Sequence, residues 1–176
     1  RDFVISAPAG LSSVKAKVIG VIENQAPTKA LEFNLPVEQG EVRVEGDVCY
    51  LSLVERHRGT GAVVNGFVSG FGYTGSMAIA SSVAHDSHHM IVVGTNQEMM
   101  AAATNRLGEI GGGVSVWKDG SEVALVELPI AGLMSDSKAS EVAVKAQAIV
   151  TAMIDCGCTL NNAYMQHTLL ALVVIP

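Results

Sequence analysis

The sequence has few aromatic, basic and cysteine residues and no long hydrophobic run. Its 176 residues include one Trp, three Tyr and four Phe, and 11 Lys and Arg stand against 17 Asp and Glu, for a net charge of -6. Because no dense basic cluster and few aromatic rings are present to hold phosphates or stack bases, a nucleic-acid-binding function is not expected. The longest apolar run, Leu169 to Ile175, is much shorter than the ~20 residues of a membrane-crossing helix, so the sequence predicts no membrane span.

The three cysteines argue against a disulfide-stabilised secreted domain. Their number is odd, and Cys156 and Cys158 are separated by a single residue, which makes too short a loop for an unstrained disulfide. The start at Arg1 shows no pattern of a secretory signal. We therefore expect a protein of the reducing cytoplasm.

What is present is the composition of one folded domain. Hydrophobic residues make up 49% and charged residues 16% of the chain, which is the balance of a globular protein. We expect residues 1–176 to fold as a single domain. Because the sequence starts without Met and stops directly after an apolar run, we also expect it to be a piece of a longer chain.

Alternating and apolar segments predict many strands. They lie at Val14–Glu23, Glu41–Glu45, Val48–Val54, Met77–Ala80 and Met90–Val93, with a last strand at Leu169–Ile175. The intervening segment Gly59–Gly75 holds six of the 18 glycines, so we expect bends and bulges there rather than a helix.

Two helices and a hairpin are predicted in the second half. Thr95 and Glu98 form a capping box that predicts a helix to about Ile110, and a second helix is expected over Lys138–Cys156. Between them, Asp119-Gly120 is a strong hairpin signal. Strands and helices do not alternate regularly, so we expect an α+β fold of two packed mixed or antiparallel sheets, sandwich-like, with the two main helices packed outside.

The most polar stretch of the chain is the loop expected between two short strands. It contains His85, Asp86, Ser87 and His88, which could act as metal ligands or as a general acid and base. The alternative is a loop whose short polar side chains bind its own backbone. Without a supporting Cys pair or glutamate, no bound structural metal is expected.

A second candidate is the charged cluster that follows the strand ending at Val54. Arg56 and His57, with the glycines just after them, could form a rim for a ligand or an anion. The alternative is an ordinary solvated strand end.

These segments carry a resemblance that runs through nearly the whole chain. On Ser81–His88 followed by Val92–Asn96, the sequence resembles the C-terminal domain of bacterial adenine deaminases, of the amidohydrolase superfamily. Other segments resemble that domain in the same order: Val54–His57 with Gly59–Gly61, Gly66–Val68 with Gly70–Gly72, Gly111–Gly113, Leu128–Asp136, and Leu169–Leu172 with Val174–Pro176.

The resemblance implies the function of a longer parent enzyme. Members of the family hydrolyse adenine to hypoxanthine and ammonia in purine salvage, with a divalent metal, manganese or iron, held in a (β/α)8 barrel. The His-x-His ligand pair of that barrel has no counterpart in this chain. The resemblance thus implies that the barrel of the same polypeptide is the partner of this domain, that the fragment alone is inactive and holds no cofactor, and that the parent is a homodimer.

Two hypotheses of different classes follow for the domain itself. In the first, it lends a polar loop to the rim of the metal site in the absent barrel, with His85, Asp86, Ser87, His88, Arg56 and His57 as the substrate-rim candidates. In the second, it is purely a structural or dimerisation module with no contact to substrate. The position of the His85–His88 loop relative to the barrel separates the two.

Overall fold

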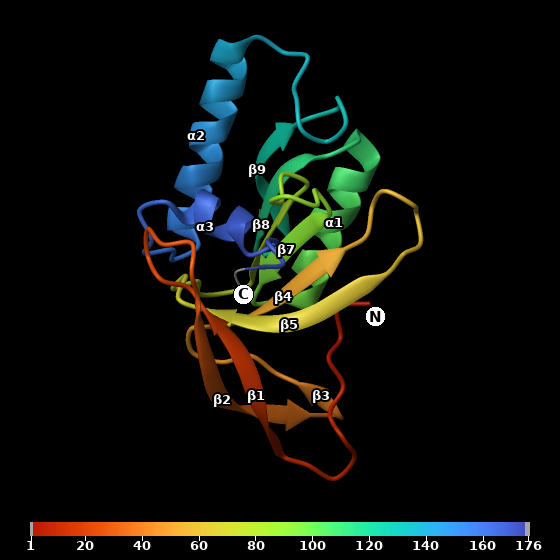
Figure 1. Ribbon diagram of the computed structural model, residues 1–176, viewed down its shortest axis with the longest axis vertical. Helices are drawn as coiled ribbons and strands as arrows, with labels where there is room; N and C mark the ends of the chain where they lie inside the picture. Colours follow the sequence, from red (N-terminus) through yellow and green to blue (C-terminus); the bar gives the residue numbers. More distant parts are fainter. Residues whose placement is uncertain (1, 175–176) are drawn as a thin grey trace.

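Within residues 2–174, which the computed structural model describes, a single mixed sheet of nine strands forms the centre and helices pack on both faces (Figure 1). The strand order across the sheet is β3-β2-β1-β5-β4-β7-β6-β8-β9, and β1 with β5 is the parallel pair among antiparallel neighbours. In chain order the elements are β1 (Ser13–Gly20), β2 (Lys29–Glu38), β3 (Glu41–Val42), β4 (Val48–Val54), β5 (Val63–Ser69), β6 (Met77–Ser81), β7 (Met90–Gly94), α1 (Gln97–Ile110), β8 (Gly113–Lys118), β9 (Ser121–Glu127), α2 (Ala139–Asp155) and α3 (Ala163–Leu169).

The α+β class is confirmed, but the strands form one sheet in the described part of the chain, where two packed sheets were expected. The first three strands join the rest through parallel pairing of Ile19 with Val68 and of Gly20 with Ser69. Helices supply the cover that a second sheet would have given, with α1 on one face and α2 and α3 on the other. Strands covered on both faces are apolar throughout, so their sequence does not reveal what covers them.

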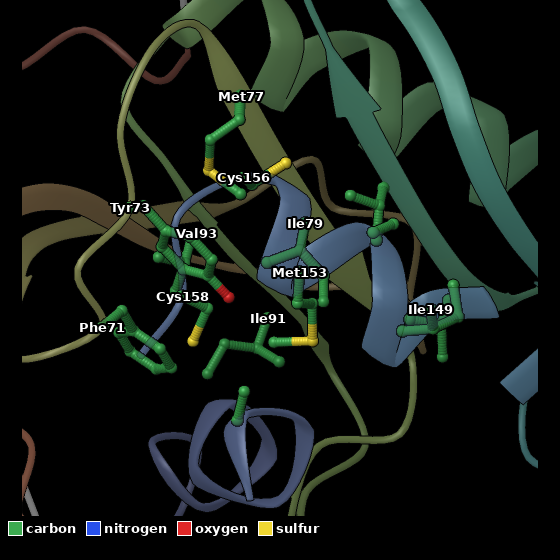
Figure 2. Packing of buried hydrophobic residues seen from close by; sticks show 14 of the residues in the cluster. Phe71, Tyr73, Met77, Ile79, Ile91, Val93, Ile149, Met153, Cys156 and Cys158 are labelled. Carbon is green, nitrogen blue, oxygen red and sulfur yellow. The ribbon is translucent and has the colours of Figure 1, made fainter. Parts of the chain in front are cut away.

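Each face of the sheet carries its own hydrophobic core. Along β6, Met77 and Ile79 enter one core, and Ala78 and Ala80 enter the other. Figure 2 shows the first core, where Met153 of α2 approaches the sheet beside Ile79. The small alanine side chains face α1, which contacts β6 closely. Among residues 2–174, no helix has the length and apolar character needed to cross a membrane.

The start of α1 differs by one residue from the predicted capping box. Asn96 is the cap, and its Oδ1 accepts hydrogen bonds from the backbone N–H groups of Glu98 and Met99 at 2.9 and 3.1 Å. The hydroxyl of Thr95 instead donates to the carbonyl of Gly75 at 2.6 Å. Asn and Thr are both good caps. Here the hydroxyl of Thr95 does not cap the helix, because it binds the carbonyl of Gly75, which is distant in sequence.

The strand expected at the C-terminal end is wrong where the structure describes it. Residues 163–169 form α3, and residues 170–174 contain no strand, while Ile175 lies outside the described residues. Only Leu169 of the apolar run belongs to α3, and Val173 and Val174 are 90% and 84% exposed, so apolar composition alone did not indicate a buried strand here. Ala163 and Leu170 pack into the core between the sheet and α2.

His167 of α3 is a fully buried ionisable group. Desolvation lowers its pKa to about 4, and the backbone of Ile91 offsets this only in part. Neither ring nitrogen has a hydrogen-bond partner of good geometry among the described residues. The folded state therefore holds the imidazole neutral.

We expect His167 to make the chain less stable in mild acid. The unfolded chain binds a proton below about pH 6.5, whereas the folded chain resists protonation until about pH 4, so stability is lost as the pH falls through this window. Between pH 7 and pH 5 the free energy of unfolding should drop by about 2 kcal/mol more in the wild type than in His167→Leu. Urea unfolding at both pH values measures this, and equal pH dependence of the two proteins would contradict it.

Candidate functional site

Three loops meet at one end of the sheet, and they contain all six candidate residues. Residues 55–62 connect β4 to β5, residues 82–89 connect β6 to β7, and residues 128–138 connect β9 to α2. The register explains the meeting: Val54 at the end of β4 pairs with Met90, and Ser81 at the end of β6 pairs with Val114. Because these strands are antiparallel neighbours, their ends and the loops that follow them lie at the same end of the sheet.

Glu55 organises the first of these loops. One carboxylate oxygen accepts hydrogen bonds from the backbone N–H groups of His57 and Arg58 at 2.6 and 2.7 Å. The other accepts from the backbone and the hydroxyl of Thr60 at 3.0 and 2.9 Å. These donors, with the Thr60 backbone the strongest, lower the pKa of Glu55 to about 2. Charge-assisted hydrogen bonds of this kind fix the loop around a carboxylate that stays ionised.

Arg56 ties the three loops together. Its Nε donates to the carbonyl of His88 at 2.5 Å, and its Nη2 donates to the carbonyl of Ala131 at 2.8 Å. The two acceptors lie 32 and 75 residues from Arg56 in sequence. A planar guanidinium with several N–H donors suits such a contact, because it can bond to two separate carbonyls at once.

His57 binds the loop of residues 82–89 as well. Its Nε2 donates to the carbonyl of Ser87 at 2.7 Å, which places the proton on Nε2 because a carbonyl only accepts. The ring lies 4.8 Å from the ring of His89, centroid to centroid, at an angle of 50°. A shallow pocket beside this pair is lined by Glu55, His57, Arg58, Thr60 and His89.

The side chains of the His85–His88 loop have no polar partner among residues 2–174. Asp86 and Ser87 are exposed, and His85 and His88 are half-buried. Two backbone N–H groups anchor the loop: that of His85 donates to Thr168 of α3 at 3.2 Å, and that of His88 donates to Ala84 at 2.7 Å. Within residues 2–174 these four side chains make no hydrogen bond or ion pair, and Nδ1 of His85 is buried without a partner. The loop is held by its backbone.

The third loop depends on residues that the sequence did not single out. The hydroxyl of Ser82 donates to the carbonyl of Gly132 at 2.7 Å and accepts from the N–H of Gly113 at 2.7 Å. Gly132 has φ +72°, and a Cβ there would lie 2.8 Å from Nη1 of Arg56. Gly112, at φ +122°, would place a Cβ 2.4 Å from the Cα of Gly132. Glycine is therefore required where these backbones touch.

The sequence contained partial signals for this arrangement. The three consecutive glycines at 111–113 mark a close approach of backbones, but one sequence cannot say which segment approaches. Ser82 is a small polar residue at the end of a buried strand and gives no signal of its own. Arg56 and His57 were candidates for the rim of a ligand, with a solvated strand end as the alternative; the structure shows both donating to the backbone of the neighbouring loop.

Residues 2–174 contain neither a cluster of metal ligands nor a reactive thiol. No group of three or more His, Cys, Asp or Glu residues that could hold a metal ion occurs among the described residues. The three cysteines are buried free thiols. Burial raises the pKa of Cys49 to about 12 and also raises the pKa values of Cys156 and Cys158; Figure 2 shows the latter two inside the core. They act as packing groups.

Comparisons with known proteins give one consistent answer. A model of the adenine deaminase C-terminal domain family matches residues 25–176. Adenine deaminases of Ruegeria pomeroyi and Roseobacter denitrificans are each 70% identical over 100% and 99% of the chain, and one of Moorella thermoacetica is 45% identical over 99%. The chain spans only 29% to 30% of the length of these relatives.

We expect Arg56→Ala to destabilise the chain and Arg58→Ala not to. Removing Arg56 leaves the carbonyls of His88 and Ala131 without their charged donor, and each such hydrogen bond is worth ~1.5 to 3 kcal/mol where water is excluded. Because the guanidinium is half-exposed, we expect a net loss of about 2 kcal/mol. Arg58 is exposed and its side chain makes no hydrogen bond or ion pair in residues 2–174, so its removal should change stability by less than ~0.5 kcal/mol.

Urea unfolding of the two variants measures the difference directly. Equal stabilities for Arg56→Ala and Arg58→Ala would show that the contacts of Arg56 contribute nothing beyond those of a solvated arginine.

Proposed function

The chain belongs to the family of adenine deaminase C-terminal domains, and on that premise we propose that it is the C-terminal part of an enzyme that hydrolyses adenine to hypoxanthine and ammonia in purine salvage. The observation that carries the proposal is the family match over residues 25–176, together with 70% identity along the chain to proteins named adenine deaminase. We place the enzyme in the cytoplasm, which suits three cysteines that remain free thiols.

We infer that the chemical step takes place in the part of the polypeptide beyond this chain. Replacing the amine of adenine by oxygen requires an activated water and a proton for the departing ammonia. A divalent metal, manganese or iron, would supply the activated water when bound. The described residues contain no donor group that fits such a metal, so its ligands are assigned to the rest of the polypeptide.

We further propose that the His85–His88 loop lies at the rim of that active site. The support is the way in which the loop is held. Arg56 and His57 bind its backbone, while the side chains of its own residues make no hydrogen bond in residues 2–174. Adenine offers ring nitrogens that accept hydrogen bonds and an amine that donates them. A histidine can donate or accept according to its tautomer, and Asp86 can accept from the amine.

The second candidate function is a structural or dimerisation module. Two observations favour it. Arg56 and His57 donate hydrogen bonds to the backbone of the His85–His88 loop, and α2 and β9 expose apolar side chains. Val123 is 47%, Val144 71% and Ile154 57% exposed. Such side chains suit contact with a second subunit, and we propose a homodimer on this ground. The two candidate functions differ in the loops: the first requires them to contact substrate, whereas in the second the domain has no contact to substrate.

We expect the purified 176-residue chain, supplied with Mn²⁺ or Fe²⁺, not to deaminate adenine. It lacks the ligand set needed to lower the pKa of a bound water toward ~7. Measuring hypoxanthine formation, with the full-length enzyme as the positive control, tests this. A turnover close to that of the full-length enzyme would place the active site within the chain and overturn the assignment.

We expect loss of the loop histidines to slow the full-length enzyme without unfolding it. His85→Ala and His88→Asn should lower kcat/KM by ~10- to 1000-fold if the rings contact the transition state, while the melting temperature stays within a few degrees. Asn is chosen for position 88 because φ is +53° there and Asn tolerates this conformation.

Asn105→Ala, on the exposed side of α1, is the matched control and should have wild-type kinetics. If both loop variants keep wild-type kcat/KM, or lose activity only by unfolding, the loop is structural and the second candidate function stands.

A further inference from the structure

The turn of residues 129–135 exposes two large apolar side chains next to each other. Ile130 is 45% and Met134 is 58% exposed. Their backbones form an antiparallel bridge, in which each N–H donates to the carbonyl of the other residue at 3.1 Å. Residues paired in this way carry their side chains on the same side, ~5 Å apart. The result is a small apolar projection on the surface.

This turn is held firmly, although it is a loop on the surface. Arg56 binds the carbonyl of Ala131, and the buried hydroxyl of Ser82 binds the carbonyl of Gly132. Gly132 itself is buried against the guanidinium. A half-buried charge and a buried hydroxyl thus fix the position of a turn whose tip consists of exposed apolar groups. Exposed apolar groups on a fixed surface are typical of a contact with another protein surface.

We propose that Ile130 and Met134 are the apolar anchor by which this domain docks on the remaining part of its own polypeptide, with Arg56 as the positioning residue that sets the anchor relative to the His85–His88 loop. The inference rests on the proposed function, because one guanidinium binds both the turn and the carbonyl of His88. If the loop faces the active site of the rest of the polypeptide, the turn must lie in the same interface.

The size of the parent identifies the occupant. The chain spans 29% to 30% of the length of its relatives, so more than two thirds of such a polypeptide lies outside it and is available within the same molecule. Among the other large exposed apolar side chains, Val123, Val144 and Ile154 lie on β9 and α2 and have no hydrogen-bonded link to the His85–His88 loop. They are available for a contact other than the one proposed for Ile130 and Met134.

Oxidation of methionine by hydrogen peroxide, followed by mass spectrometry of the full-length enzyme, tests the docking. Oxidation follows exposure, so a Met134 that is still 58% exposed should react within about threefold of its rate in the urea-unfolded protein. A docked Met134 should react at least about tenfold more slowly than in the unfolded protein. A rate within threefold of the unfolded rate overturns the proposal.

Two substitutions make this test specific. Ile130→Asp should raise the oxidation rate of Met134 to near the unfolded value, because a carboxylate cannot be buried in an apolar contact without a partner. The matched control Val144→Asp, on the exposed face of α2, should leave the rate of Met134 unchanged. Met153, which is fully buried in the core, serves as an internal reference, because it reacts quickly only when the fold is lost. If Ile130→Asp speeds both methionines, that variant has lost its fold, and the cross-linking experiment below decides.

Photo-cross-linking identifies the occupant. Met134→Cys in the full-length enzyme is labelled with a benzophenone maleimide, which Cys49, Cys156 and Cys158 should resist because they are buried with raised pKa values. The expected product has the mass of one chain and joins position 134 to a peptide outside residues 1–176. A product with the mass of two chains, which would show contact with a second copy, or no product at all, overturns the proposal.

The outcome is separable from that of the proposed active-site role. Protection of Met134 with unaltered kinetics of His85→Ala and His88→Asn would keep the docking and remove the rim function. An unprotected Met134 would remove the docking, whatever the loop variants do.

Discussion

The guanidinium of Arg56 is the contact on which the arrangement of the candidate site depends. The three loops at this end of the sheet are not paired with one another by backbone ladders; they meet through side chains that bind carbonyl groups. Arg56 reaches two of the loops from the third, and His57 adds a bond to the adjacent carbonyl. Because such bonds are directional, they fix the relative position of segments that would otherwise vary independently.

That contact is possible only because the sheet brings its strand ends into line. Five antiparallel neighbours, β4, β7, β6, β8 and β9, end or begin at the same edge. Both faces of these strands are packed, on α1 in one direction and on α2 and α3 in the other. A fully packed sheet cannot shift without disturbing two cores at once. Rigid strands therefore present the loops, and polar contacts join them.

Much of the fold could be predicted from local patterns, whereas its assembly could not. Alternation and apolar runs located β4, β6 and β7 to within about one residue, the Asp119-Gly120 signal located the β8–β9 hairpin, and capping located α1. β2 was missed because Pro36 interrupts the alternation of Leu31, Phe33, Leu35 and Val37, and proline is unusual inside a strand. α3 was missed because it is a single short helix, Ala163–Leu169, in which Gln166, His167 and Thr168 are buried, so its sequence shows no apolar stripe at helical spacing.

The candidate site shows the same division. Residue type singled out Arg56 with His57 and the His85–His88 loop as two separate candidates, and the structure brings them together. Their roles could not be predicted from residue type, because the same arginine or histidine side chain can bind either a distant backbone carbonyl or a ligand. The contributions of Ser82 and Gly132 depend on contacts between segments 50 residues apart, which no local pattern records.

The pairing of β1 with β2 bears on where the unit can be divided. The family match begins at residue 25, between the two strands of a hairpin whose register pairs eight residues of β1 with eight of β2. Residues before β1 are also engaged: the N–H of Ala7 donates to Gly40, and the N–H of Val42 donates to Ile5. A polypeptide cut at residue 25 would leave β2 with an unpaired edge open to association with other chains. The physical boundary of this unit lies upstream of residue 25, where the family match begins.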